Sequence, residues 1–197
     1  SLGDLELPGI GSAGLSTKDD RTTAFLTYTS YNEPTSIYRV DLADMGATRL
    51  LWARPDVPVD PSMVEVSQVW YPSKDGTKVS MFIIHKKGLE LDGDNPTILY
   101  GYGGFNISMT PSFSATMFPW FEDGGVYAVA NLRGGGEYGA EWHTAGMMEM
   151  MTTTWATVSL LKESRLQWLR AALRTLCQKK SRMMRYSAKK TLKQWKR

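Results

Sequence analysis

Alternation of apolar and polar positions divides the first 150 residues into two groups of short strands. The first group has predicted strands at 24–31, 36–41 and 48–52, where β-branched and aromatic residues recur at strand-like spacing. The polar run Asn32–Thr35 between the first two is typical of a turn. Three strands with tight connections predict a β-meander or one blade of a β-propeller, which has exposed edges and too little core to stand alone.

A second group of strands follows the proline-rich segment 58–61. Four strands are expected there, at 64–71, 78–86, 97–102 and 125–131. The first two form a hairpin, because Asp75-Gly76 between them tolerates the positive φ angles that such turns need. The last two run into glycines, and a helix is expected to begin near Glu137. An antiparallel pair followed by apolar strands with glycine-rich exits indicates an α/β sheet.

The last 47 residues follow another pattern. Between 156 and 177 leucines recur every three or four positions, which predicts an amphipathic helix with one apolar face: Leu166, Leu169, Leu173 and Leu176. Residues 1–150 hold 10 Lys+Arg against 19 Asp+Glu, whereas residues 151–197 hold 13 Lys+Arg and only Glu163 as an acid. All 18 glycines and all 9 prolines precede residue 151. This break indicates that the tail was shaped by other constraints than the part before it.

Composition excludes several classes of protein. A single cysteine, Cys177, cannot form a disulfide within the chain, and no apolar run approaches the roughly 20 residues of a membrane span. The start has no basic and apolar leader, so we expect a cytoplasmic protein. No residue pattern indicates a metal or a cofactor. Cys177 lies among basic residues, which lower the pKa of a thiol, but no base for a cysteine nucleophile is evident.

The sequence Tyr100-Gly101-Tyr102-Gly103-Gly104-Phe105 directly follows an apolar strand. Glycines allow the backbone to approach a ligand closely, and in α/β-hydrolases the loop after the third strand supplies an oxyanion-hole donor. A tyrosine hydroxyl fixed near the developing negative charge could serve equally. The alternative is a plain glycine-rich turn between sheet elements. The local pattern leaves both interpretations open.

A second glycine-rich run, Arg133–Gly136, follows the next strand. Its backbone N–H groups and the arginine suit an anion, but the spacings of a P-loop and of a dinucleotide site are missing, which favours a tight strand-to-helix loop. The two histidines, His85 and His143, have no evident nucleophile to serve, which favours a structural role for each.

Residues 4–146 resemble the prolyl oligopeptidase family. The resemblance rests on SQVWYPSKDGTKVSMFIIHKKGLELDGDNPTILYGYGGFNIS and VYAVANLRGGGEYGAEWHTAG, and upstream on ELPGIGSAGLSTKDD and TSYNEPTSIYRVDL. The family joins a β-propeller to an α/β-hydrolase domain and cleaves short peptides after proline by Ser-Asp-His catalysis. The resemblance implies a remnant of the last propeller blade at 1–57, a partial α/β-hydrolase sheet at 58–150, and a basic helical tail without a family match at 151–197.

The resemblance also implies roles for individual residues. Tyr102 matches the tyrosine whose hydroxyl helps to form the family's oxyanion hole. Phe105 matches an aromatic residue near the proline-binding pocket, and Gly103 and Gly104 match the glycines that shape this loop. Asn131 and the run that follows it match a stretch that we interpret as structural.

The chain departs from the family beyond residue 146. It contains no G-x-S-x-G sequence and no glycine after Gly146, and neither His85 nor His143 matches the catalytic histidine. We therefore expect a fragment of a serine-type endopeptidase that lacks the Ser/Asp/His triad and is inactive alone. The composition break near 147 favours a frameshift, an alternative exon or a gene-model error.

Two other interpretations involve the tail at 151–197. One is a non-catalytic interaction protein whose basic amphipathic helix binds an acidic partner; the other is a non-functional frameshifted product. Because no recognised nucleic-acid-binding fold accompanies the basic charge, we expect no nucleic-acid partner.

Overall fold

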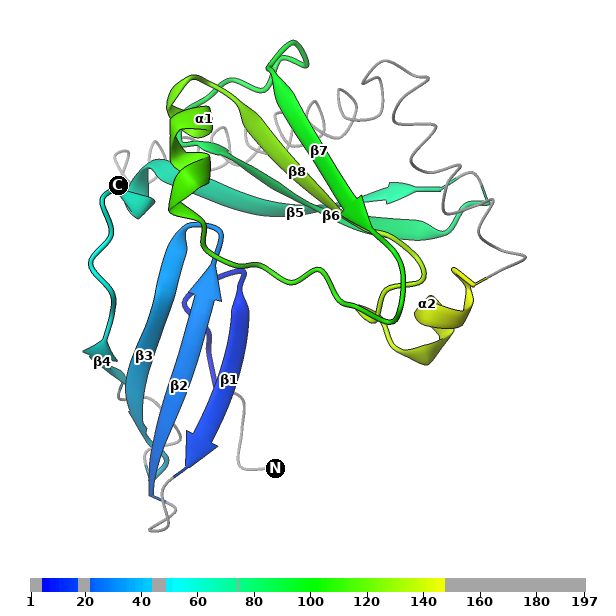
Figure 1. Ribbon diagram of the computed structural model, residues 1–197. Coiled ribbons are helices and arrows are strands. Elements are labelled where there is room, and N and C mark those ends of the chain that lie inside the picture. The colour runs from blue at the N-terminus through cyan, green and yellow to red at the C-terminus, as the bar shows by residue number, and fades with distance from the viewer. Residues whose placement is uncertain (1–4, 18–21, 44–48, 74, 148–197) are drawn as a thin grey trace, which may run out of the picture.

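Two four-stranded sheets make up the part of the chain that the structure describes (Figure 1). The structure is a computed structural model in which residues 5–17, 22–43, 49–73 and 75–147 are described. The predicted helix of the basic tail lies outside these residues. Neither α-helix among them exceeds five residues, so the sheets and their loops position everything else.

The first sheet is an antiparallel meander with the order β1-β2-β3-β4. Its strands are β1 (Ser12–Thr17), β2 (Thr23–Ser30), β3 (Glu33–Asp41) and β4 (Arg49–Ala53). The sequence predicted only the last three, because β1 (SAGLST) contains one large apolar residue, Leu15. Four antiparallel strands in chain order are the composition of a propeller blade.

The predicted turn at Asn32–Thr35 begins one residue too late and ends three residues too late. The turn occupies Tyr31 and Asn32, and β3 already begins at Glu33. The register between β2 and β3 shifts between Tyr28 and Ser30. Pro34, which has no N–H to donate, lies opposite this irregularity, where a strand tolerates proline.

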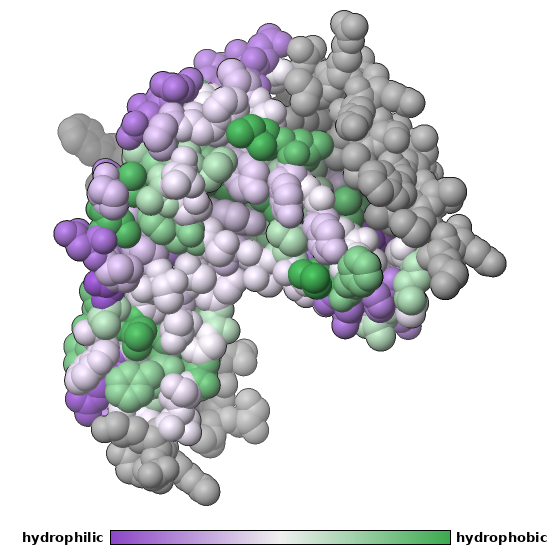
Figure 2. Space-filling view, viewed as in Figure 1, coloured by the Kyte–Doolittle hydropathy of each residue, from purple (hydrophilic) through white to green (hydrophobic). Residues whose placement is uncertain are grey.

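Only one face of the first sheet has a buried core. Ala24, Leu26 and Val40 are at most 2% exposed and are packed by three partly buried residues: Leu5, Tyr38 and Leu42. Large apolar side chains are exposed elsewhere on this lobe, which shows green areas in Figure 2: Leu15, Leu50, Leu51 and Trp52. The small core agrees with the expectation that a single blade has too little core to be stable alone.

The second sheet has the order β5-β6-β8-β7, so the chain crosses over within it. Its strands are β5 (Val64–Pro72), β6 (Lys78–Lys86), β7 (Thr97–Tyr102) and β8 (Val126–Asn131). β6 pairs antiparallel with β5 and with β8, whereas β7 and β8 are parallel. The expected positions of these strands are confirmed, and Gly76 in the hairpin turn has the predicted positive φ, 81°.

Apolar residues are buried on both faces of the second sheet. One cluster includes Met81, Ile83 and Ala128. The other contains Phe82, Ile84 and Val129 and is covered by Phe118 and Phe121 of α1 (Phe118–Glu122), a helix too short to leave a periodic signal in the sequence. The second helix, α2 (Ala140–Thr144), begins just after Glu137, where a helix was expected.

Hydrogen bonds and aromatic rings join the two sheets. The Ser12 hydroxyl donates to the carbonyl of Pro111 at 2.7 Å, and the Asn32 amide donates to the carbonyl of Val64 at 3.1 Å. Figure 1 shows the loop from β7 to α1 passing close to the first sheet.

Tyr31, in the β2–β3 turn, is the aromatic residue at this junction. Its ring packs against those of Phe82 and Tyr127, with centroids 5.7 and 6.3 Å away. It also lines a cavity of about 210 Å³ with side chains from the second sheet and its loops: Ser112, Ser114, Met117, Phe121 and Tyr127. Burial raises the pKa of the Tyr31 hydroxyl, so this group stays neutral.

Candidate active site

Tyr102 is the last residue of β7, and in the parallel register it lies beside Asn131, the last residue of β8. The carboxyl ends of parallel strands meet at one edge of a sheet, where open α/β sheets bind their ligands. Both glycine-rich runs therefore begin at the same end of the sheet, where β7 and β8 end. The sequence predicted each run separately but did not show that they are neighbours.

The backbones of the two runs touch. A Cβ placed on Gly103 would lie 2.5 Å from the carbonyl oxygen of Arg133, closer than atoms can approach. Gly134 has φ near +100°, and a Cβ there would lie 2.5 Å from the carbonyl oxygen of Gly103. No side chain fits at either position, so glycine is required for the loops to meet.

Tyr102 folds back over the turn that follows it. A Cβ built on Gly104 would lie 3.6 Å from the Tyr102 hydroxyl oxygen, an ordinary contact. The next two residues, Phe105 and Asn106, have φ angles of 52° and 57°, which L-residues adopt rarely. Phe105 is 85% exposed. The loop thus holds a strained backbone from which the Phe105 ring projects into solvent.

The carbonyl of Gly134, in the second glycine-rich run, is hydrogen-bonded to this strained segment. It accepts a hydrogen bond from the backbone N–H of Asn106 at 3.1 Å. It also lies 2.7 Å from Nδ1 of His143, which must be the protonated ring nitrogen because a carbonyl can only accept. These contacts support the structural interpretation of His143.

A hydrogen-bonded group centred on Asn131, named here the Asn131 network, anchors the far end of the same loop. The Asn131 amide donates to the carbonyl of Met109 at 2.9 Å and to Oε1 of Glu137 at 3.2 Å, and the Met109 N–H donates to the same Oε1 at 2.8 Å. Behind them, the Tyr138 hydroxyl donates to Ser80 at 2.6 Å, and Ser80 donates to Oδ1 of Asn131 at 2.9 Å.

The sequence did not predict the Asn131 network. Asn131 was interpreted as structural without a partner, and Glu137 was noticed only as the start of a helix. The one available signal was a polar residue, Ser80, between Val79 and the apolar run 81–84 of β6. A buried hydroxyl needs a hydrogen-bond partner, but the sequence does not identify it.

Arg133 faces away from the glycine-rich loop. Its guanidinium lies 2.5 Å from the carboxylate of Asp75 in the β5–β6 turn, and it donates to the hydroxyls of Thr77 and Ser73 at 3.3 and 3.4 Å. The side chain is 6% exposed. This hydrogen bond holds the pKa of Asp75 down to about 2. With its charge already neutralised, Arg133 gives no support to the anion-binding interpretation of this run.

The other candidate residues lie apart from Tyr102 or outside the described residues. His85 is buried on β6, with Nδ1 2.8 Å from the carbonyl oxygen of Lys86. Cys177 lies outside the described residues. Within the described ranges, no three His, Cys, Asp or Glu side chains come together in a way that could hold a metal ion.

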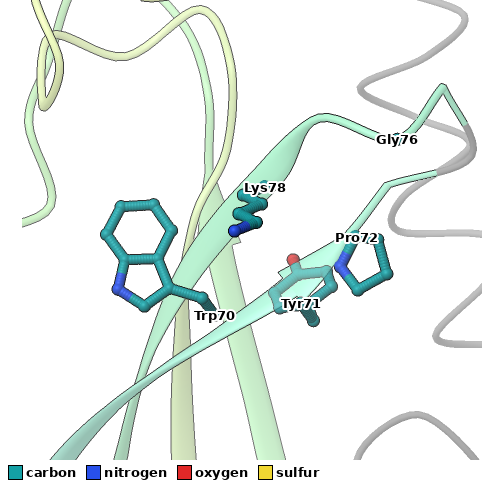
Figure 3. Close-up of a pocket in the computed structure, with 5 residues that line it drawn as sticks. All are labelled: Trp70, Tyr71, Pro72, Gly76 and Lys78. Carbon is teal, nitrogen blue, oxygen red and sulfur yellow. The ribbon is translucent and has the colours of Figure 1, made fainter.

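A larger cavity lies at the β5–β6 hairpin and not at Tyr102. It has a volume of about 570 Å³ and is lined by Trp70, Tyr71, Pro72, Gly76 and Lys78, which Figure 3 shows around the ends of the two strands. Trp70 and Tyr71 are adjacent in a strand, so their side chains leave opposite faces. None of the residues predicted to act on a substrate lines this cavity.

The geometry defines a class of protein. A mixed sheet that begins with an antiparallel pair, and that carries a tyrosine and a glycine turn at the carboxyl end of a parallel strand, has the features of the first part of an α/β-hydrolase site.

Comparisons with known proteins identify the family. The Prolyl oligopeptidase family matches residues 111–157. The prolyl endopeptidase of Elizabethkingia miricola is 46% identical over 144 residues, which are 73% of this chain and 20% of that protein. The dual function macrocyclase-peptidase POPB of Amanita bisporigera is 41% identical over 148 residues, 74% of this chain and 20% of that protein.

Solved structures agree with these sequence matches. A structure from an analysis of two prolyl endopeptidases has a TM-score of 0.73 and 46% identity, covering 83% of this chain and 24% of that one. Prolyl oligopeptidase B from Galerina marginata, bound to a 25mer macrocyclization substrate, has a TM-score of 0.67 and 38% identity, covering 75% and 21%.

The described part of the chain belongs to the prolyl oligopeptidase family of serine peptidases, so the predicted resemblance is confirmed. The chain spans about one fifth of the length of the curated relatives it matches. The family match continues to residue 157, somewhat beyond the expected 146. In the described ranges no helix has the length and apolar character needed to cross a membrane.

Proposed function

We propose that this chain supplies the oxyanion-donor side of a site that cleaves short peptides after proline, and that the 197 residues alone do not hydrolyse peptides. The observation that carries the proposal is the position of Tyr102 at the carboxyl end of β7, with its hydroxyl over the Gly103-Gly104 turn. Family membership supports the same assignment.

The proposed reaction is acyl transfer. A serine attacks the carbonyl carbon of the proline residue, whose oxygen becomes an oxyanion that accepts a hydrogen bond from Tyr102. The amine of the following residue then leaves, and water hydrolyses the acyl-enzyme. Phe105, which is exposed three residues after Tyr102, offers an apolar surface to the proline ring. Removing one oxyanion donor typically lowers the rate by about 10²–10³. Because the 197 residues contain no G-x-S-x-G sequence, the attack has no nucleophile in this chain.

The remaining assignments are part of the same proposal. The chain divides into a propeller remnant at 1–57, the first part of the peptidase domain at 58–150, and a basic tail at 151–197 that binds an acidic partner. We place the protein in the cytoplasm, with short proline-containing peptides as the substrates of the complete enzyme.

A side-by-side assay tests the lack of activity. The purified chain and the Elizabethkingia miricola prolyl endopeptidase are each incubated with a chromogenic prolyl peptide. We expect turnover by the relative and none above a denatured control by this chain. Turnover by the chain that scales with its concentration and is blocked by a serine-directed phosphonate contradicts the proposal.

The role of Tyr102 is tested in the active relative within the same experiment. Changing the relative's equivalent tyrosine to phenylalanine removes only the hydroxyl, so we expect kcat to fall about 10²-fold while KM changes little. An unchanged kcat contradicts the assignment of Tyr102 as the oxyanion donor.

A further inference from the structure

Phe105 lies in a tight turn whose backbone conformation is unfavourable for phenylalanine. The Ile107 N–H donates to the carbonyl of Gly104 at 3.0 Å and closes a four-residue turn. Its central residues, Phe105 and Asn106, both have positive φ angles, as in a type I′ turn, where glycine, asparagine and aspartate dominate. A strained backbone of this kind persists only where its surroundings fix it.

Three glycines of the second glycine-rich run lie against this turn. The carbonyl of Gly134 accepts the Asn106 N–H at 3.1 Å. A Cβ built on Gly135 would lie 2.8 Å from the carbonyl oxygen of Ile107. One built on Gly136 would lie 2.7 Å from the carbonyl oxygen of Asn106. Both distances are too short for a side chain, so the position of the turn depends on the run after β8.

Glu137 follows these glycines and holds the end of the same loop, residues 103–109, which we name the Phe105 loop. Its Oε1 accepts the Met109 N–H at 2.8 Å and the Asn131 amide at 3.2 Å. Asn131 is 2% exposed and lies beside Tyr102 in the register of β7 and β8. One carboxylate oxygen therefore ties the far end of the Phe105 loop to the ends of the two strands.

We propose that Glu137 is a positioning residue for peptide binding, because it fixes the Phe105 loop where the Phe105 ring meets the proline of the substrate. The inference rests on the proposed function, which assigns Phe105 to the proline ring. Tyr102 is held by the pairing of β7 with β8 and does not need the carboxylate. Glu137 thus affects how tightly the peptide binds, whereas Tyr102 affects how fast the bond is cleaved.

Steady-state kinetics of the Elizabethkingia miricola prolyl endopeptidase test this division. With a chromogenic prolyl peptide, the change equivalent to Glu137→Ala should raise KM about tenfold, the lower end of what an apolar contact in a pocket is worth. Since the lost interaction is one of binding, kcat should change little. A residue that only stabilises the fold leaves both constants unchanged while the enzyme is folded, which circular dichroism at the assay temperature verifies.

Glutamine at the same position is the matched control. Oε2 of Glu137 has no hydrogen-bond partner in the described part of the chain, so the contacts with the Phe105 loop pass through Oε1. The change to glutamine keeps an oxygen there that accepts both N–H groups. We therefore expect it to restore the KM of the unmodified enzyme.

A double variant shows whether Glu137 acts through Phe105. The change equivalent to Phe105→Ala should raise KM by itself. If the carboxylate acts only by placing this ring, the double variant has the KM of the phenylalanine variant alone, because the two residues share one interaction. Independent roles would instead multiply the two increases in KM.

Hydrogen exchange in the 197-residue chain gives a measurement without activity. The Asn106 N–H, which bonds to Gly134 in the strained turn, should exchange faster in Glu137→Ala than in the wild type. In Glu137→Gln it should exchange at the wild-type rate. Equal rates in Glu137→Ala and the wild type overturn the inference.

The kinetic outcomes separate this inference from the function on which it rests. A KM that rises in the phenylalanine variant but not in the alanine variant at the glutamate overturns the inference alone. Multiplied effects in the double variant, or a glutamine variant that behaves like alanine, do the same. A phenylalanine variant with unchanged KM overturns the proposed role of Phe105 and the inference with it. An active relative whose own residue at this position accepts no hydrogen bond also contradicts the inference.

Discussion

At the residue scale, Arg133 shows how a charged side chain beside a candidate site can belong to the scaffold. It is buried, and its guanidinium reaches back to the β5–β6 turn, where Asp75 neutralises it. A buried cation without a partner is costly. The ion pair therefore fixes the start of the second glycine-rich run against a hairpin more than fifty residues earlier in the chain.

Asp75 predicts a dependence of stability on pH. Its pKa falls from 3.8 unfolded to about 2 folded, so its contribution to the free energy of unfolding is complete above about pH 4 and disappears as the pH falls through 2. Because Asp75 is 35% exposed, we discount this contribution to about 1 kcal/mol. Urea denaturation should show Asp75→Asn less stable than the wild type at pH 7 and nearly equal to it near pH 2.

Asp56→Asn, an exposed position between the two sheets, is the control for this measurement and should follow the wild type at both pH values. A difference between Asp75→Asn and the wild type that persists unchanged at pH 2 contradicts the assignment.

At the element scale, the loop after β7 takes its shape from the run after β8. Glycines bring the two backbones into contact at Gly103 and Gly134, and the Asn131 network holds the loop where it reaches Met109. The left-handed Phe105 and Asn106 lie between these two anchors. A strained backbone persists only when its surroundings fix it, so the second run is needed for the first to present its aromatic ring.

Glu137→Ala tests the Asn131 network. The substitution removes Oε1, the acceptor for the Met109 N–H and the Asn131 amide, and leaves polar groups unpaired. We expect the free energy of unfolding to fall by about 1–3 kcal/mol. Hydrogen exchange should quicken at Met109. Glu122→Ala, an exposed position on α1, should change neither quantity, and equal effects of the two variants contradict this role.

At the scale of the whole molecule, the two described sheets have separate cores, and that of the first sheet is small. Tyr31 contributes the aromatic part of this junction, between Phe82 and Tyr127. Because the first sheet has a core of only a few residues, it draws stability from the second sheet across this contact.

Tyr31→Ala should loosen the first sheet more than the second. Losing a partly buried aromatic ring lowers the free energy of unfolding by about 2 kcal/mol. The lost contacts are those between the two sheets. Hydrogen exchange should quicken in β2 and β3 more than in β6 and β8. Tyr31→Phe keeps both ring contacts and is the control; if it behaves like Tyr31→Ala, the rings are not what joins the sheets.

The sequence predicted those parts of the fold that have a strong local signal. The strands from β2 to β8 alternate or form apolar runs, and Asp75-Gly76 marks their hairpin. β1 and α1 were missed because one is nearly devoid of large apolar residues and the other is only five residues long. Their positions are set by contacts distant in sequence, such as that of Ser12 with Pro111.

The candidate site was predictable in its residues but not in its arrangement. Tyr102 and its glycines were found from the pattern and the family resemblance. The contact between Gly103 and Gly134 depends on the crossover in the second sheet, which no local signal reveals. The missing motifs already favoured a tight strand-to-helix loop at Arg133, but the sequence could not identify its partner, Asp75.

The strand order of the second sheet also affects how the chain can fold during synthesis. β7 leaves the ribosome before β8, yet β8 is its only described partner and also its only connection to β6. Until residue 131 has emerged, the strand that ends in Tyr102 has no sheet to join, and its uncharged residues are exposed to other nascent chains. The interval between the emergence of residue 102 and that of residue 131 is thus one in which this strand is open to misassembly.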